Sequence, residues 1–416
     1  MTTLSIAQKE IVHAPIGVSL QVLAAAGSGK TRVLTERISH IFQTKIKEGI
    51  IALTFTNKAA EEMLLRLNNF EGIEDCCWIS TVHGVAQRIL NQYGHTIGLP
   101  SELHIYDREQ DCKTVFLQSL RNRGINIDEF LNVHDKKTKK EREQIIQRYM
   151  EQFSIIKREL LNENEIKEKY INSKNFWQIF VAYQEALLES GGIDFDDILV
   201  YSHRILLEQP WCGKIYRTNY KHICVDEAQD LNKAQYEFIK ALCSDEITSL
   251  MMVGDPNQMI FGFNGSSNDF FCTQFVNDFN PLKFRLNENY RSSKAVIHLS
   301  NKLKPGSQIE SDFALDGKRF FQNLKDEDSE ASWIIDKIKE LLQIKNDPEI
   351  EGDITLNNIV IIGRNKFVFK KLEECLKNNK IAYSLKKGER QVEPSSLFGK
   401  ILDSCYSSQI KFKRLG

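Results

Sequence analysis

The sequence is short of three features that would each point to a class of protein: net charge, paired cysteines and long apolar runs. Lysine and arginine number 55 against 56 aspartate and glutamate, a formal net charge of −1, which excludes a uniformly basic coat for nucleic acid. Any nucleic-acid contact must therefore come from local patches and stacking groups. The nine cysteines include no CxxC pair of the kind that marks a zinc or redox site, and a reduced cytoplasmic protein fits best.

Membrane and secretion signals are also missing from these residues. No apolar run reaches the roughly 18 residues of a membrane-spanning helix. The start, MTTLSIAQKE, lacks the basic and apolar regions of a signal peptide. What the 416 residues do contain is 42% hydrophobic side chains, enough for two or three domains with buried cores. We expect a globular protein without a membrane partner.

A loop of small residues stands between two apolar patterns in QVLAAAGSGKTRVL, residues 21–34. The apolar residues before the loop predict a short buried strand and those after Thr31 predict a helix, the order that a phosphate-binding loop requires. Lys30 is then expected at the β and γ phosphates and Thr31 on Mg²⁺. The predicted nucleotide contacts are Ala26, Gly27, Ser28, Gly29, Lys30 and Thr31. A turn without ligand is the alternative, since Ala24 stands where the general pattern has its first glycine.

A second apolar strand, within HICVDEAQDLNKAQYEFIKAL (residues 222–242), ends at two adjacent acids. We expect Asp226 to hold Mg²⁺, directly or through water, and Glu227 to polarise the water that attacks the γ phosphate. Adjacent acids at a strand end are common on protein surfaces by chance. Their occurrence together with the phosphate loop is what indicates an ATP-hydrolysing site.

These two segments belong to a series of motifs whose order and spacing resemble superfamily 1 DNA helicases of the UvrD/Rep group. The motifs are LTFTNKAAEEM (53–63), STVHG (80–84), DEAQD (226–230), VGDPNQMIFGF (253–263) and LNENYRSS (286–293). The resemblance implies an α/β fold of tandem RecA-like phosphate-loop NTPase domains with parallel sheets. It also implies ATP and Mg²⁺ as cofactors and single-stranded DNA as a partner.

The resemblance assigns further roles around the nucleotide. Gln8, ahead of the first strand, would read the adenine edge, because an amide can donate and accept at once. A lone glutamine in an N-terminal segment is otherwise usually solvated. Tyr290 would stack on the adenine, and Arg32 would lie near the nucleotide. Gln258 would sense the γ phosphate, and Arg291 would reach it as an arginine finger.

A second group of residues is implied in gripping single-stranded DNA at the carboxyl ends of the strands. These residues are Thr54, Phe55, Thr56, Asn57, Thr81, His83, Phe261 and Phe263. Phe55 is explained equally well as core, since strand aromatics usually pack, and a lone histidine is more often structural. Where the family typically has Tyr and then Trp-Arg, this chain has Phe261 and then Phe263-Asn264. A phenylalanine ring still stacks on a base, but the missing guanidinium removes a cation near the strand.

The order of the motifs predicts how the domains are arranged. Residues 1–93 and 190–281 are expected to form the first RecA-like domain, because the phosphate loop and the acidic strand lie on either side of a helical, charged stretch. That stretch, 94–189, is expected to be a helical insertion. Its basic segment 134–150 predicts either a wall for duplex DNA or a solvated helix face.

Residues 282–416 are expected to form a second RecA-like domain that is incomplete, with a strand in NIVIIGR at 358–364. Family members then carry another helical domain and a second arginine finger, neither of which is recognisable here. Either the chain is the amino-terminal part of a longer polypeptide, or these parts are reduced or supplied by a partner. We therefore expect residues 1–416 alone to bind ATP and Mg²⁺ but to hydrolyse ATP slowly.

Two functions fit these observations. The first is an ATP-dependent single-stranded DNA translocase or helicase, moving 3′ to 5′ as the resemblance implies, on single-stranded DNA or on DNA with a single-stranded tail. The alternative is a nucleotide-sensing or DNA-loading subunit that acts with a nuclease subunit, as UvrD-like proteins do in Gabija-type antiphage defence systems. Weakened stacking residues would suit the alternative.

Overall fold

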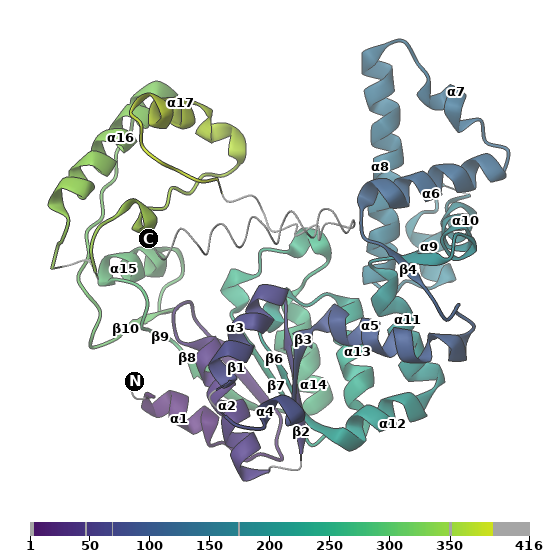
Figure 1. Ribbon diagram of the computed structural model, residues 1–416, viewed down its shortest axis with the longest axis horizontal. Helices are drawn as coiled ribbons and strands as arrows, with labels where there is room; N and C mark the ends of the chain where they lie inside the picture. The colour runs from purple at the N-terminus through teal and green to yellow at the C-terminus, as the bar shows by residue number, and fades with distance from the viewer. Residues whose placement is uncertain (1–3, 46–47, 69, 174, 349–351, 386–416) are drawn as a thin grey trace. The chain divides into compact units, whose positions relative to one another are not determined.

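The computed structural model describes residues 4–45, 48–68, 70–173, 175–348 and 352–385. Contacts between residues divide the chain into two compact units, Met1–Ala314 and Leu315–Gly416. Each unit is described by itself below (Figure 1). Among the described residues, no helix combines the length and the apolar character needed to cross a membrane.

The first unit is built on a six-stranded, entirely parallel sheet with the strand order β3-β2-β6-β7-β1-β8. The strands are β1 (Leu20–Ala24), β2 (Gly49–Thr54), β3 (Cys77–Thr81), β6 (Tyr220–Val225), β7 (Ser249–Gly254) and β8 (Leu282–Leu286). The inner strands β2 and β7 are buried along their whole length, as continuous apolar runs in a parallel sheet must be. The predicted α/β class and parallel sheet are confirmed.

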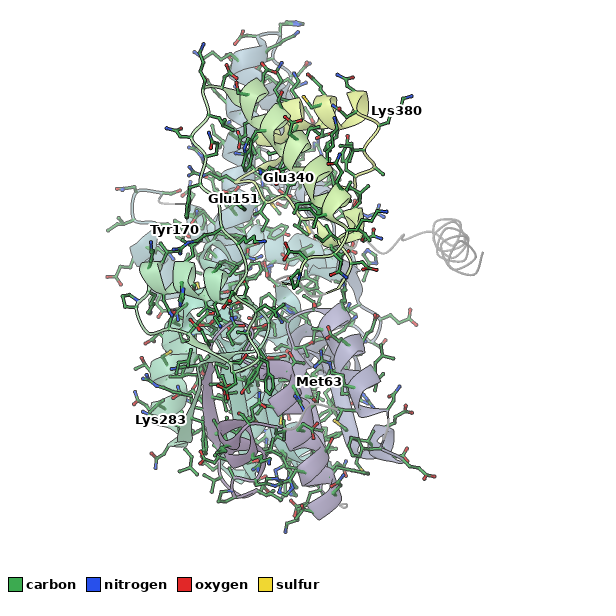
Figure 2. All side chains as sticks on the ribbon, turned by 90° about the vertical axis from the view of Figure 1, so that its left-hand side faces the viewer. Met63, Glu151, Tyr170, Lys283, Glu340 and Lys380 are labelled. Atoms are coloured by element: carbon green, nitrogen blue, oxygen red, sulfur yellow. The ribbon has the colours of Figure 1, made fainter. Side chains whose placement is uncertain are left out.

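Helices cover both faces of this sheet because successive strand residues point to opposite sides. In β2, Ile50 and Ala52 pack into one core, whereas Ile51 and Leu53 pack into the other. The first core is covered by α1 (Ile6–Val12), α2 (Lys30–Thr44), α3 (Asn57–Leu67) and α4 (Ile73–Cys76). Met63 of α3, labelled in Figure 2, is fully buried in it. The second core is covered by α5 (Val82–Tyr93), α11 (Asp197–Glu208), α12 (Pro210–Asn219), α13 (Lys233–Cys243) and α14 (Phe275–Phe279).

In the stretch predicted as a helical insertion, the described residues form five α-helices with an aromatic core of their own. They are α6 (Glu109–Asn122), α7 (Ile127–Leu131), α8 (Lys136–Arg158), α9 (Glu163–Lys169) and α10 (Phe176–Glu189). Phe116, Phe153 and Tyr183 are buried at the centre of this core. A short parallel pair, β4 (His104–Tyr106) with β5 (Gly192–Asp194), lies where the chain enters and leaves these helices.

The expected domain boundary at Leu282 is not where the contacts divide the chain. All five residues of β8 pair in register with β1, from Leu20 opposite Leu282 to Ala24 opposite Leu286. The strand is therefore the edge of the first sheet, and Lys283 is exposed there (Figure 2). The unit continues through β9 (Glu288–Asn289), α15 (Lys294–Leu303) and β10 (Ile309–Glu310).

The second unit contains α16 (Glu327–Ile344) and α17 (Lys370–Asn378), which bury Ile335, Ile338 and Leu372 between them. The strand expected at 358–364 is not formed: within the described residues of this unit no segment pairs with it. Ile359 does have extended backbone angles, but an extended segment becomes a strand only when a neighbour completes its hydrogen bonds. The expectation of a strand there was wrong for the described residues.

Candidate functional site

The predicted phosphate loop joins the end of β1 to the start of α2. Gly27 and Gly29 have φ angles of 72° and 85°, in the left-handed region that favours glycine. A Cβ atom on Gly27 would lie 2.4 Å from Oδ1 of Asn289, so the loop also needs glycine for space. Ser28 donates its hydroxyl to the Ala25 carbonyl at 2.8 Å and tightens the turn. The result is a compact loop that places the N-terminal amides of α2 where an anion can bind.

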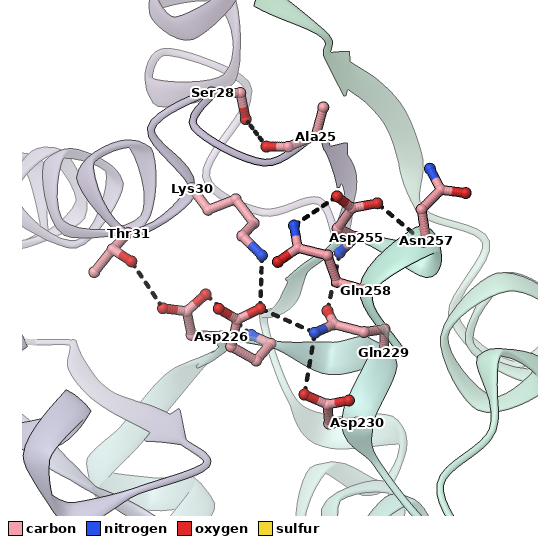
Figure 3. A network of polar contacts seen from close by, with 11 residues as sticks. Ala25, Ser28, Lys30, Thr31, Asp226, Gln229, Asp230, Asp255, Asn257 and Gln258 are labelled. Carbon is pink, nitrogen blue, oxygen red and sulfur yellow. Dashed lines mark hydrogen bonds and ion pairs between the residues drawn. The ribbon is translucent and has the colours of Figure 1, made fainter. Parts of the chain in front are cut away.

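Four of the residues expected to act on the phosphates and on Mg²⁺ come together at the carboxyl ends of β1 and β6 (Figure 3). Nζ of Lys30 lies 2.7 Å from Oε2 of Glu227, and the Thr31 hydroxyl donates to Oδ2 of Asp226 at 3.2 Å. Burial, with the negative Glu227 beside it, raises the pKa of Asp226 to about 6. A hydroxyl and a carboxylate oxygen at this spacing are ligands that suit Mg²⁺. The donor set therefore fits the predicted metal.

A chain of hydrogen bonds runs from Glu227 to the predicted γ-phosphate sensor. Gln229 donates to Oε2 of Glu227 at 3.0 Å and accepts from the Asp255 amide at 2.9 Å. Gln258 then donates to Oδ2 of Asp255 at 2.7 Å (Figure 3). Glu227 itself has φ 51°, an uncommon backbone for this residue type that is typical of functional sites. We call Glu227, Gln229, Asp255 and Gln258 the polar relay.

Gln8 and Tyr290, the two residues predicted to contact the adenine, lie beside the loop. The Gln8 amide donates to the Ser28 carbonyl at 3.0 Å, and Ser5 and Gln8 form a reciprocal cap at the start of α1. Tyr290 donates its backbone N–H to the Gly27 carbonyl at 2.9 Å. A pocket of about 250 Å³ opens here, lined in part by Ser5, Ser28 and Tyr290.

The two predicted arginines differ in how the structure positions them. Arg291 is exposed and follows Asn289, whose side chain accepts from the backbone N–H groups of Arg291 and Ser292, both at 2.8 Å. A Cβ on Gly27 would lie 2.9 Å from Cβ of Arg291, so this segment packs directly on the phosphate loop. Arg32 lies in the first turn of α2.

The aromatic residues expected to grip DNA also lie at the carboxyl end of the sheet. The rings of Phe55 and Phe261 stack with centroids 5.4 Å apart, and Phe263 is tilted against Phe261 at 6.0 Å. Phe55 is only half-buried, whereas the Phe263 side chain is 77% exposed. His83, at the start of α5, stacks on the exposed ring of Phe195 at 4.4 Å. We call Phe55, His83, Phe195, Phe261 and Phe263 the aromatic face.

His83 is kept uncharged by its surroundings. Burial, and secondarily the positive charge of Arg158, lower the pKa of His83 to about 4. Its ring therefore offers a stacking surface near neutral pH and no positive charge.

The predicted polar contacts with DNA are used within the fold. Thr54 is buried and donates to the Thr56 carbonyl at 3.0 Å, while the Thr56 hydroxyl accepts from the Ala59 amide at the start of α3. Thr81 caps α5 in the same way, accepting from the Gly84 amide at 3.0 Å. Asn57 is the first residue of α3 and is exposed. These three threonines shape the loops, and of the four residues Thr56 and Asn57 are exposed.

Several residues of the site were not identified from the sequence. Gln229 and Asp255 lie inside quoted motifs, and their near-complete burial next to charged residues is what marks them in the structure. Asn289 precedes the Tyr-Arg pair and is buried too. Phe195 lies in GGIDFDDILV, residues 191–200, where its position between two aspartates is a signal of exposure.

Comparison with known families agrees with this arrangement. Residues 4–280 match the family model described as UvrD/REP helicase N-terminal domain, and residues 284–391 match the UvrD-like helicase C-terminal domain. DNA helicase II of Escherichia coli is 31% identical over 402 residues, which cover 93% of this chain and 52% of that protein. The probable DNA helicase II homolog of Mycoplasma capricolum is 31% identical over 381 residues, covering 88% and 49%. The ATP-dependent DNA helicase srs2 of Schizosaccharomyces pombe is 32% identical over 394 residues, covering 88% and 42%. The chain thus spans about half the length of these relatives.

Proposed function

The chain belongs to the UvrD/Rep helicase family, and from that membership we propose that it couples ATP hydrolysis to movement along single-stranded DNA. The direction proposed is 3′ to 5′, and the substrate is single-stranded DNA or DNA with a single-stranded tail. The relatives named above are DNA helicases, and their names support this proposal.

The observation that carries the proposal is the pairing of the phosphate loop with the acidic strand end. Lys30 and Glu227 neutralise each other across 2.7 Å. When a nucleotide enters, Lys30 exchanges this carboxylate for the β and γ phosphates, which leaves Glu227 to orient water and accept its proton. Thr31 and Asp226 would hold Mg²⁺, whose charge stabilises the phosphates when it is bound.

The nucleotide is proposed to sit between the loop and the segment that carries Tyr290 and Arg291. Gln8 reads the adenine edge and Tyr290 stacks on the ring, beside the pocket next to Ser28. Arg291 reaches the γ phosphate, since its Cβ already lies close to Gly27. A guanidinium there stabilises the charge that develops during phosphoryl transfer.

The polar relay is proposed to report the state of the γ phosphate to the DNA. Gln258 is three residues before Phe261, and only three residues separate the short helical turns Pro256–Gln258 and Gly262–Asn264. When Lys30 leaves Glu227 for the phosphates, the change in the hydrogen bonds of Glu227 is therefore passed to Gln229, Asp255 and Gln258 in turn. Bases of a single strand stack on the aromatic face, which tolerates any sequence and suits a motor.

Steady-state ATP hydrolysis by the 416-residue chain, with and without a single-stranded oligonucleotide, tests the proposal. For this chain alone we expect slow hydrolysis that requires Mg²⁺, increases little with DNA and is lost in Glu227→Gln. The matched control is Glu237→Gln, which changes a carboxylate on α13 outside the relay. Hydrolysis that survives in Glu227→Gln contradicts the assigned chemistry.

A second candidate function has one observation in its favour. Asn264 stands where a guanidinium is typical of the family, and Phe263 replaces a larger ring. A nucleotide-sensing or DNA-loading subunit that acts with a nuclease can function with a lower affinity for DNA than a motor needs. This function would be favoured if the complete assembly binds both ATP and DNA but does not hydrolyse ATP in response to DNA.

A further inference from the structure

Arg158 is the last residue of α8 and extends from the helical insertion to the aromatic face. Its Nε donates to Oδ1 of Asp196 at 2.9 Å, and its Nη1 donates to Oδ1 of Asn264 at 3.2 Å. Its side chain remains 27% exposed. A guanidinium has five N–H donors, so these two bonds fix its plane and leave donors for another acceptor.

The two residues that hold Arg158 are each the neighbour of an exposed aromatic ring. Asp196 follows Phe195, which is 47% exposed, and Asn264 follows Phe263, which is 77% exposed. The guanidinium thus bridges the two segments that carry these rings. Because His83 is uncharged near neutral pH, it contributes no positive charge beside Arg158.

A purely structural role is already filled by the preceding residue. Lys157 is buried, and its Nζ lies 2.5 Å from Oδ2 of Asp194 and 2.9 Å from Oδ1 of Asp197. This buried ion group ties α8 to the strand β5 and the helix α11. Lys157 therefore points inward to join the insertion to the sheet, whereas Arg158 keeps part of its charged group in solvent.

We propose that Arg158 binds a backbone phosphate of the single-stranded DNA whose bases stack on the aromatic face. The inference rests on the proposed function, because it requires DNA at this face. Arginine presents a planar fork that matches two phosphate oxygens, and an aromatic platform with an adjacent cation is a general way to hold a single strand. The helical insertion thereby contributes directly to the path of the strand.

The test is the salt dependence of binding between the 416-residue chain and a fluorescent oligo-thymidine, followed by anisotropy. Arg158→Gln is expected to weaken binding about tenfold at low salt, the effect of one charge-assisted hydrogen bond. The slope of log affinity against log salt should flatten by about 0.7, the value for one lost phosphate contact on a single strand. Arg158→Lys should keep most of the slope, because it keeps the charge.

Two further variants separate phosphate contact from positioning. Asn264→Asp leaves Arg158 in place but adds a carboxylate at its Nη1, so it should also weaken binding and flatten the slope. The double variant Arg158→Gln, Asn264→Arg places a guanidinium on the other side of the contact between these two residues. It should restore the slope of log affinity against log salt. The matched control is Arg204→Gln on α11, which also removes a guanidinium paired through Nε with a carboxylate, Glu208 at 2.7 Å.

The outcomes distinguish this inference from the function on which it rests. Absence of DNA binding by the unchanged chain overturns both. The inference alone is overturned if the unchanged chain binds DNA normally and Arg158→Gln does not alter the salt slope. It is also overturned if Arg158→Gln and Arg204→Gln lose the same amount of DNA affinity. Thermal melting shows whether Arg158→Gln is folded. If it is not, Asn264→Asp decides, and an unaltered slope in that variant overturns the inference.

Discussion

The nucleotide edge and the aromatic face lie at the same end of one sheet, yet they are built in opposite ways. At the nucleotide edge, comprising the phosphate loop and Asp226–Asp230, charged groups are paired with each other, as Lys30 is with Glu227. At the aromatic face, Phe263 and Phe195 present exposed rings. A ligand at the nucleotide edge must replace the partners that these charged groups already have within the protein. A ligand at the aromatic face only covers rings that the fold leaves exposed. The nucleotide edge is therefore expected to be selective for its ligand, and the aromatic face to tolerate different ligands.

The largest expected effect is at the nucleotide edge. Lys30→Ala should abolish tight ATP binding, because it removes the cation for the phosphates and leaves Glu227 without its counter-ion. Glu227→Gln should keep binding and lose hydrolysis. Titration with a fluorescent nucleotide measures both. Lys240→Ala, which removes an exposed lysine paired with Asp278, is the control for loss of charge. Equal loss of binding in Lys30→Ala and Glu227→Gln would count against these separate roles.

A smaller effect is expected inside the polar relay. Gln229→Leu leaves the buried Asp255 amide without its acceptor and removes one of the two donors to Oε2 of Glu227, the other being Lys30. We expect the free energy of unfolding to fall by about 1–3 kcal/mol, the range for buried polar groups left unpaired. Urea denaturation measures it, with Gln274→Leu as the control, since that amide pairs with Asp269 at the surface. Equal midpoints for the two variants would show that the relay is not preorganised.

The sequence predicted the nucleotide edge better than the aromatic face, for a physical reason. Phosphate binding needs particular residues at fixed spacing on one loop, so Gly27, Lys30 and Thr31 can be recognised from a short segment. The acidic pair after β6 follows from the same logic. The α/β class and the parallel sheet follow from apolar runs separated by helical patterns.

The features that escaped prediction depend on contacts between distant segments. Arg158 donates to Asn264, which is 106 positions away in the sequence, and nothing in the sequence around either residue predicts this contact. The place of the strand Leu282–Leu286 at the edge of the first sheet is likewise set by its pairing with β1, which lies far away in the sequence. Local pattern likewise predicted a strand at 358–364, whereas strand formation depends on a neighbour.

The aromatic face is expected to be moderately sensitive to truncation. Phe263→Ala should weaken affinity for a single-stranded oligonucleotide by about 1–3 kcal/mol, the contribution of one stacked base. Nucleotide affinity measured without DNA should stay unchanged, which would sharpen the contrast between the two regions. Phe313→Ala, which removes another exposed ring of the first unit, is the matched control. An unchanged dissociation constant for DNA would remove Phe263 from the strand path.

The smallest expected effect concerns the partly buried ring of the aromatic face, His83, whose pKa is lowered to about 4 by burial. Because this value lies below that of an unfolded histidine, about 6.5, the unfolded chain binds a proton between these pH values and the native chain does not. Stability contributed by the neutral ring is therefore present above pH 6.5 and is lost as the pH falls towards 4. A shift of this size corresponds to at most about 3 kcal/mol, and since the ring is partly exposed we expect about 1 kcal/mol. Urea denaturation at pH 7 and pH 4.5 should show a smaller loss of stability in His83→Gln than in the unchanged chain. Equal losses would mean that solvent reaches the His83 ring freely, and that stacking on Phe195 leaves it as open as the ring of Phe263.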